Sequence, residues 1–114
     1  MLPQNNRIKK KKDFEIIFKK GAGFKNSSFI LKVLKNGLEY SRFGFVVSQK
    51  VSKKAVERNK IRRRLSEIIK NNFKNTKKGL DLVFVSLPEV KNKDFGQLRV
   101  EIKSILIKAK CLTQ

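Results

Sequence analysis

The apolar residues of this chain recur with two periods, one typical of helices and one typical of strands. Residues 1–12, MLPQNNRIKKKK, follow neither period and are mostly polar and basic, so we expect an extended or partly ordered basic arm. The run DFEIIFKKG then carries apolar residues at helical spacing between Asp13, an N-capping residue type, and Gly21, a terminating one. This run predicts a helix of about two turns.

Two segments alternate in the manner of strands, residues 24–34 and residues 43–48. Asn36-Gly37 lies between them and is a strong turn signal. We therefore expect the two strands to pair antiparallel through the connection at 35–41. A third run, LDLVFVSL at residues 80–87, is nearly continuous in apolar residues and predicts a central strand buried on both faces.

A long helix is predicted from a cap at Ser52 to about Phe73. Its apolar stripe consists of Ile61, Leu65, Ile68, Ile69 and Phe73. At 100° per residue, the opposite side forms a cationic ridge of Asn59, Lys60, Arg63, Lys70 and Lys74. Arg58 falls on the apolar side, so we expect the first turns to extend beyond the edge of the core.

The last helix is expected after Asp94, which has the spacing of a capping box with Gln97. The predicted order is then helix, strand, strand, helix, strand, helix. That order is typical of a compact two-layer α+β sandwich. Because the chain has 114 residues, of which 39% are hydrophobic, we expect one domain, residues 1–114.

The charge of the chain indicates what kind of partner it binds. The chain has 29 Lys and Arg residues but 9 Asp and Glu residues, which gives a formal net charge of +20. A folded chain with this imbalance repels itself, and a polyanion relieves the repulsion. We therefore expect a nucleic-acid partner. No apolar run reaches the roughly 18 residues that would span a bilayer, and no spare apolar face suits a lipid surface. We expect a cytoplasmic protein with no membrane partner.

The chain lacks the residue types that several kinds of catalysis require. It contains no His and a single Cys, Cys111, which excludes His-based acid–base chemistry and a Cys-based zinc site. The acidic residues form no D-x-D or E-x-x-H cluster, and the glycines form no phosphate-binding loop. We therefore expect no catalytic residue, no metal site and no cofactor intrinsic to the protein.

The aromatic residues are nine Phe and one Tyr. Phe14 and Phe18 are candidates for stacking on RNA bases, because lysines flank their short helix on both sides. Phe29 or Phe45 could do the same on an open face of the sheet.

The stretch FGFVVSQKVSKKAVERNKIRRRL, residues 43–65, resembles the signature of the bacterial ribonuclease P protein subunit. In that family a Val-Ser-x-Lys strand end leads into a helix that opens Ala-Val-x-Arg-Asn-x-Ile-x-Arg. The same elements stand here at residues 47–50 and 55–63. The opening Asn6-Arg7-Ile8-Lys9, followed by Asp13-Phe14 and Phe18, is also similar.

The resemblance implies a ribonuclease P protein-like fold, ribosomal protein S5 domain 2-like, with a left-handed βαβ crossover. It implies that the long helix lies against the catalytic RNA, and that a cleft between the first helix and the sheet receives the 5′ leader of precursor tRNA. The RNA-binding candidates are Lys53, Lys54, Arg58, Asn59, Lys60, Arg62 and Arg63. The leader-binding candidates are Arg7, Lys9, Phe14, Phe18 and Lys50.

On this interpretation the chain is the accessory subunit of the endoribonuclease that removes the leader to give the mature tRNA 5′ end, and it broadens the substrate range. The catalytic RNA, with Mg²⁺ as its cofactor, performs the hydrolysis, and one protein monomer binds one RNA. Three positions depart from the common pattern of the family. Lys60 and Ser66 stand where relatives often have Arg, and Lys32 stands where they often have an aromatic residue.

Two other classes of function stay open. A structural RNA-binding protein of the ribosomal type would share the charge but would have no leader cleft. An autonomous nuclease would cleave RNA without a partner. Enhanced cleavage of precursor tRNA by a catalytic ribonuclease P RNA at limiting Mg²⁺ separates the ribonuclease P subunit from the ribosomal-type protein. Cleavage by the protein without RNA would identify the autonomous nuclease.

Overall fold

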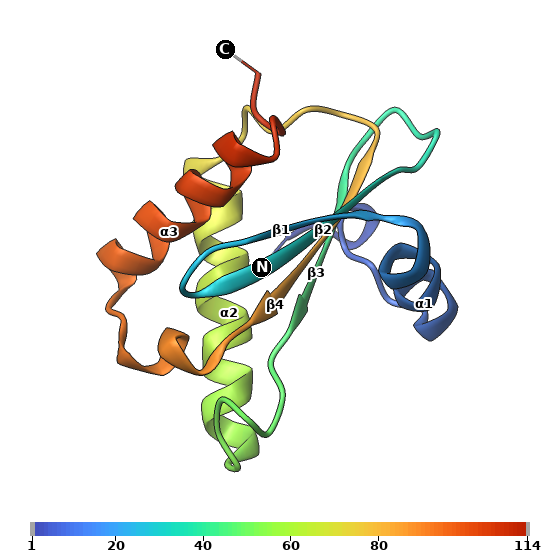
Figure 1. Ribbon diagram of the computed structural model, residues 1–114. Helices are drawn as coiled ribbons and strands as arrows, with labels where there is room; N and C mark the ends of the chain where they lie inside the picture. Colours follow the sequence, from blue (N-terminus) through green and yellow to red (C-terminus); the bar gives the residue numbers. More distant parts are fainter. Residues whose placement is uncertain (1, 114) are drawn as a thin grey trace.

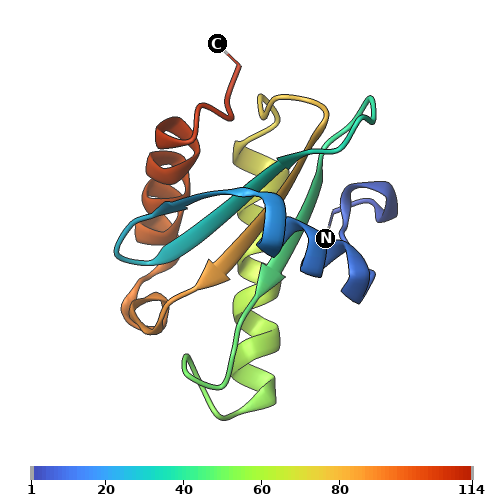
Figure 2. The ribbon, with the colours of Figure 1, turned by 45° about the vertical axis from the view of Figure 1, so that its right-hand side comes forward.

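A computed structural model describes residues 2–113 as a four-stranded sheet with helices on both faces (Figures 1 and 2). The elements in chain order are η1 (Gln4–Asn6), α1 (Lys11–Lys20), β1 (Ala22–Lys25), β2 (Phe29–Lys35), β3 (Arg42–Val46), α2 (Ala55–Asn72), β4 (Leu80–Ser86), η2 (Pro88–Asn92) and α3 (Phe95–Lys108). The strand order is β1-β2-β4-β3. The α+β class expected from the sequence is confirmed.

β4 is the central strand, as its apolar sequence predicted. It pairs antiparallel with β2 and parallel with β3, so hydrogen bonds satisfy both of its edges. Leu82, Val83 and Phe84 are fully buried. The parallel pair β3–β4 is joined through α2, which forms the βαβ crossover, while its left-handed sense stays a prediction.

The expected antiparallel pairing of residues 24–34 with residues 43–48 is wrong, because β4 lies between β2 and β3. A hairpin of β2 with β3 would have left the most apolar strand at an edge, with a row of unpaired backbone groups. The Asn36-Gly37 turn instead carries the chain around the start of β4. There the N–H of Asn36 donates to the carbonyl of Gly79 at 2.9 Å.

The segment 24–34 is two strands and not one. Asn26 interrupts it, because its side-chain Oδ1 accepts from the N–H groups of Ser28 and Phe29, at 3.0 and 2.9 Å. β1 and β2 therefore form a hairpin, with Phe24 opposite Leu31. An Asn side chain that satisfies nearby backbone donors competes with a continuous strand, which alternation of apolar residues does not reveal.

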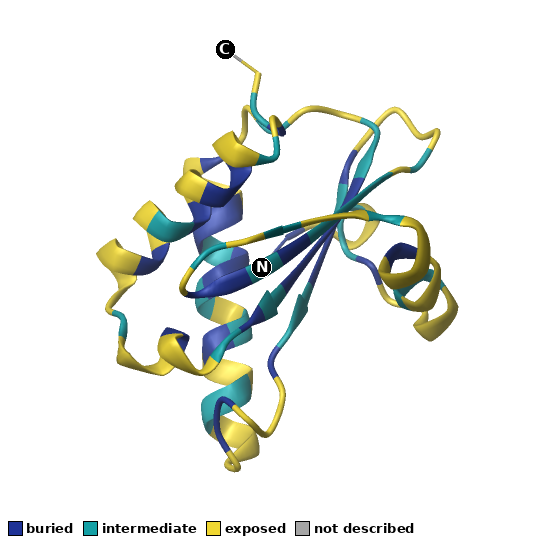
Figure 3. Ribbon diagram, in the orientation of Figure 1, coloured by how far each residue is buried: buried dark blue, intermediate teal, exposed yellow. Residues whose placement is uncertain are grey.

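The main core lies between the sheet and the helices α2 and α3, whose inner faces are buried (Figure 3). The ring of Phe84 meets Phe29 edge-on at a centroid distance of 5.9 Å and stacks on Phe45 at 5.7 Å. Phe29 is fully buried, so the expectation that it could stack on RNA is wrong. The helices contribute Leu65, Ile68, Ile69, Leu98, Ile102, Ile105 and Leu106.

A smaller cluster lies on the opposite face of the sheet, beneath α1. Ile17 of α1 packs there with Ile8 and with Val83 of β4. The expected two-layer arrangement therefore describes the sheet with α2 and α3, and α1 adds a partial layer on the other side (Figure 1).

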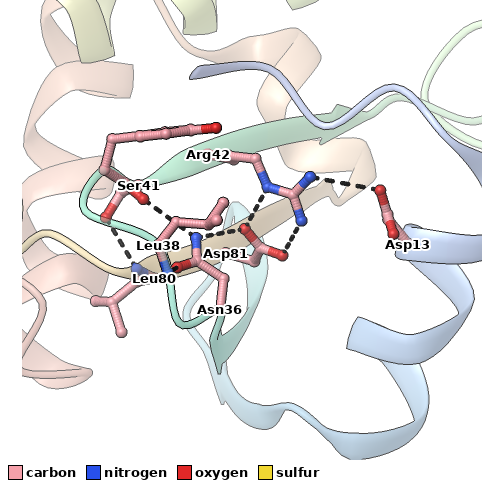
Figure 4. A network of polar contacts seen from close by, with 8 residues as sticks. Asp13, Asn36, Leu38, Ser41, Arg42, Leu80 and Asp81 are labelled. Carbon is pink, nitrogen blue, oxygen red and sulfur yellow. Dashed lines mark hydrogen bonds and ion pairs between the residues drawn. The ribbon is translucent and has the colours of Figure 1, made fainter. Parts of the chain in front are cut away.

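A polar network holds α1 against the sheet (Figure 4). Arg42 of β3 donates from Nε and Nη2 to the two carboxylate oxygens of Asp81, at 2.8 and 2.6 Å. Its Nη1 ion-pairs with Asp13 of α1 at 3.4 Å. The hydrogen bonds to Asp81 raise the pKa of Arg42, so the guanidinium group stays charged. Arg42 thus connects the start of α1 to the buried side of β4.

The segment before α1 is not an extended arm. Leu2 and Ile8 are buried, and the N–H of Ile8 donates to the carbonyl of Phe43 at 2.9 Å. Arg7 also forms a parallel bridge with Phe43. The extended alternative expected for residues 1–12 is therefore wrong over residues 2–12, and the segment is more ordered than the other alternative implied, because two apolar side chains anchor it beside β3. Met1 lies outside the described residues.

Two helices begin at other residues than expected. α1 begins before Asp13, which ion-pairs with Arg42 instead of capping the helix. α2 begins after Ser52, whose hydroxyl donates to Glu57 Oε2 at 2.6 Å and does not act as the N-cap. The capping box of α3 is confirmed, with both reciprocal hydrogen bonds present.

Candidate RNA-binding surface

A hollow of about 190 Å³ opens along β3, an edge strand of the sheet. We call it the β3-edge hollow. Its lining includes Arg7, Phe14, Phe43, Gly44, Arg62 and Arg63. Three guanidinium groups from two separate segments border this hollow, and no acidic side chain lines it. Guanidinium groups are suited to bidentate contacts with phosphate, so the hollow favours an anionic ligand.

Arg7 brings to the hollow a buried polar atom that is unpartnered within the described part of the chain. Its Nε is buried and has no hydrogen-bond partner among residues 2–113. A buried donor without a partner costs about 1–3 kcal/mol. An acceptor brought by a ligand would recover that cost, which makes Arg7 a candidate contact.

Phe14 closes the hollow over Gly44. A Cβ added at Gly44 would lie 2.6 Å from Cε1 of Phe14, so the ring occupies the space that a side chain would need. Phe14 is half-buried, and part of its ring therefore stays open to a ligand. A glycine inside a strand often marks such a close approach, a signal in the sequence that could have located this contact.

The cationic ridge predicted on α2 is confirmed. The first turn of α2 also extends beyond the core and is largely exposed (Figure 3). Val56 in this turn is 77% exposed. The exposed ridge residues are Asn59, Lys60, Arg63, Lys70 and Lys74.

Two of the expected RNA-binding arginines also donate hydrogen bonds to backbone carbonyls of the protein itself. Nη1 of Arg58 donates to the carbonyls of Ser52 and Lys53, at 3.0 and 2.9 Å. Arg62 donates to Asn59 Oδ1 at 2.6 Å and to the carbonyl of Val47 at 3.2 Å. These bonds hold the two guanidinium groups in place beside the loop that precedes α2.

The lysines of that loop form a separate group. Lys50, Lys53 and Lys54 line a hollow of about 400 Å³, together with Glu57 and Lys91. The hydroxyl of Ser52 and then the charge of Lys91 hold the pKa of the Glu57 carboxyl below its usual range. Lys50 therefore lies with the RNA-binding candidates of the loop and does not line the β3-edge hollow.

The five leader-binding candidates are only partly brought together. Arg7 and Phe14 line the β3-edge hollow, beside Arg62 and Arg63 of the other group. Phe18, 40% exposed on α1, lines neither the β3-edge hollow nor the hollow of the loop lysines, and Lys9 also lines neither. The two groups of candidates thus meet at one place, which sequence reasoning had not foreseen.

Ser66 was missed as a member of this surface. It lines the β3-edge hollow, and its hydroxyl accepts from the N–H of Leu2 at 3.3 Å. The resemblance to the ribonuclease P protein family had implied only that Ser66 departs from the common pattern at this position.

Several of the acidic residues are engaged within the fold. Asp13 and Asp81 bind Arg42, and Glu101 accepts from Ser28 Oγ at 3.1 Å. Within residues 2–113, no three or more His, Cys, Asp and Glu side chains are grouped so as to hold a metal ion. The same residues include no helix with the length and hydrophobicity needed to cross a membrane.

The fold and the surface together define the class of protein. It is a small α+β protein with a cationic face that suits a polyanion. The family model described as Ribonuclease P matches residues 2–110, and the chain belongs to this family. The ribonuclease P protein component of Pseudanabaena sp. is 36% identical over 98% of this chain and 97% of its own length. That of Thermotoga maritima is 35% identical over 90% of this chain and 91% of its own length.

Solved structures agree with the fold. The RNase P protein of Staphylococcus aureus superposes with a TM-score of 0.86 at 30% identity, over 95% of this chain and 98% of that protein. The RNase P protein from Thermotoga maritima gives a TM-score of 0.81 at 35% identity, over 90% and 96% of the two chains.

Proposed function

We propose that this chain is the protein subunit of a bacterial ribonuclease P, which binds the catalytic RNA and the 5′ leader of precursor tRNA and assists removal of the leader. The observation that carries the proposal is the β3-edge hollow, where Arg7, Arg62 and Arg63 border the half-open ring of Phe14. Guanidinium groups suit phosphates and an open ring suits a base, so the hollow fits a single RNA strand.

The hydrolysis itself belongs, in this proposal, to the RNA subunit with its Mg²⁺. The protein supplies affinity: its net charge of +20 screens the repulsion between two RNAs. It would therefore lower the Mg²⁺ concentration that the catalytic RNA needs. The chain acts in the cytoplasm, one protein to one RNA.

Reconstitution tests the proposal. The full chain, added to a bacterial ribonuclease P RNA at limiting Mg²⁺, should accelerate cleavage of precursor tRNA at the mature 5′ end. Binding without acceleration would favour a ribosomal-type RNA-binding protein. Cleavage by the protein alone would establish an autonomous nuclease and overturn the proposal.

Leader length tests the role of the aromatic residues. The double substitution Phe14→Ala and Phe18→Ala should weaken binding of a precursor with a long leader by about 1–3 kcal/mol and leave mature tRNA unaffected. Because Phe14 also packs on Gly44, Phe18→Ala alone serves as the variant that preserves the core. Equal losses for precursor and mature tRNA would show that the rings only support the fold.

Salt dependence tests the ridge. Arg63 is exposed and makes no hydrogen bond or ion pair within residues 2–113, so Arg63→Ala should leave the fold intact. It should shallow the salt dependence of binding to the catalytic RNA by about one phosphate contact. Arg99→Ala, at an exposed position on α3, is the matched control. An unchanged slope for Arg63→Ala would remove Arg63 from the interface.

A further inference from the structure

A third hollow, of about 300 Å³, lies at the C-terminal end of α2, and we call it the α2-end hollow. None of the site candidates from the sequence lines it. Its floor is apolar, formed by the buried side chains of Leu2, Phe43, Ile69 and Phe73. A volume of this size lies at the lower end of the range for small-ligand sites.

Tyr40 stands at the rim of the α2-end hollow and is the single tyrosine of the chain. It is 39% exposed, and its hydroxyl has no hydrogen-bond partner among residues 2–113. A tyrosine ring left exposed beside an apolar floor offers one surface for stacking and one polar group for a hydrogen bond.

Three lysines also line the α2-end hollow. Lys70, Lys74 and Lys78 line it, all three are exposed, and none has an ion-pair partner among the residues that the structure describes. The negative end of the α2 dipole favours a cation in the last turn, which accounts for Lys70. It does not account for Lys74 and Lys78, which lie beyond the helix.

The α2-end hollow adjoins the β3-edge hollow. Phe43 lines both hollows. Leu2, which lines the α2-end hollow, donates its N–H to Ser66, which lines the β3-edge hollow. Lys70 follows Arg63 by seven residues, so it lies on the same side of α2, about 10 Å further along. A strand of RNA bound at Arg63 can therefore continue to the α2-end hollow.

We propose that the α2-end hollow receives an unstacked nucleobase of the catalytic RNA, with Tyr40 against the base and Lys70, Lys74 and Lys78 at the neighbouring phosphates. The apolar floor suits the faces of a base, and flexible lysines suit phosphates as point charges. The inference rests on the catalytic RNA being the partner, as proposed above, and adds a second contact at a separate site.

Substitution of Tyr40 tests the base contact. Tyr40→Ala should weaken binding of the full chain to a bacterial ribonuclease P RNA by about 5- to 150-fold, the range that loss of one stacked base produces. Tyr40→Phe keeps the ring and should bind within about twofold of the wild type. Circular dichroism checks that both variants fold. Wild-type affinity in Tyr40→Ala would overturn the inference.

Chemical protection provides a readout of the site itself. Because the chain has one tyrosine, nitration by tetranitromethane reports on Tyr40 alone. The catalytic RNA should protect Tyr40 in the wild type, and an unprotected Tyr40 in the complex would contradict the inference.

The lysines are tested by charge-matched variants. Lys74→Gln with Lys78→Gln should shallow the salt slope by about 1.4, two single-strand phosphate contacts, and reduce the protection of Tyr40. Arg99→Gln with Lys103→Gln removes the same charge from exposed positions on α3 and should do neither. Equal effects of the two pairs would mean that only net charge matters.

If the wild type itself neither bound the RNA nor stimulated cleavage, the proposed function would fail. If the wild type did both and Tyr40→Ala bound the RNA equally well, only the proposed contact at the α2-end hollow would fail.

Discussion

Replacing Gly44 by alanine should destabilise the protein when residue 14 is phenylalanine and stabilise it when residue 14 is alanine. The new Cβ would lie 2.6 Å from Cε1 and 2.9 Å from Cζ of Phe14, about 1 Å closer than carbon atoms pack. Gly44 is paired with Val83 of the central strand, so β3 cannot move away. The ring must move instead, and overpacking of this kind costs about 1–3 kcal/mol.

Removal of the ring reverses the effect. In the Phe14→Ala background the new Cβ meets Cβ of Ile8 at 3.5 Å, an ordinary contact. The backbone of Gly44 is not in the left-handed region, so alanine fits its conformation. Substitution of a glycine then stabilises by about 0.4–1 kcal/mol, because the unfolded chain loses conformational freedom.

Urea unfolding of four proteins measures both effects: the wild type, each single variant and the double variant. Far-UV circular dichroism follows the transition, and an unchanged m-value ensures that midpoint shifts report stability. If Gly44→Ala had the same sign in both backgrounds, Phe14 would not occupy the space over Gly44, and the geometry of the β3-edge hollow would be wrong.

Three further outcomes are expected from the fold. Arg42→Met should lower the free energy of unfolding by about 2–3 kcal/mol. The loss is smaller than for a fully buried ion pair because water reaches Arg42. An unchanged stability to urea would contradict a stabilising role of the bond between Arg42 and Asp81. Burial raises the pKa of the Cys111 thiol, so Ellman's reagent should modify it only as the chain unfolds, and reaction at the rate of free cysteine would refute this. The lowered pKa of Glu57 contributes stability at neutral pH that is lost as pH falls through that pKa, and Ser52→Ala should raise the Glu57 pKa measured by NMR; no shift would exclude the hydrogen bond as its cause.

Local features of the chain were readable from the sequence, because they depend on neighbours along the chain. The spacing of apolar residues placed α2 and its cationic ridge, and the continuous apolar run identified β4 as central. The Asp94–Gln97 pair capped α3 as expected, since both hydrogen bonds of a capping box lie within one turn.

Long-range pairing was decided only by the tertiary structure. Alternation of residues 24–34 and 43–48 could not reveal that β4 separates β2 from β3, because alternation sets which face a side chain occupies and not which strand is its neighbour. Asp13 and Ser52 have the residue types of helix caps, yet Asp13 binds distant Arg42 and Ser52 binds nearby Glu57.

The composition of the candidate surface follows the same division. The sequence by itself determined that the chain is strongly cationic, where its basic helix lies and which aromatic residues stand near lysines. Only folding brought Arg7 to Arg62 and Arg63, and Tyr40 to the end of α2. Charge and periodicity are properties of the chain, whereas a hollow requires side chains from segments far apart in sequence to be held around one space.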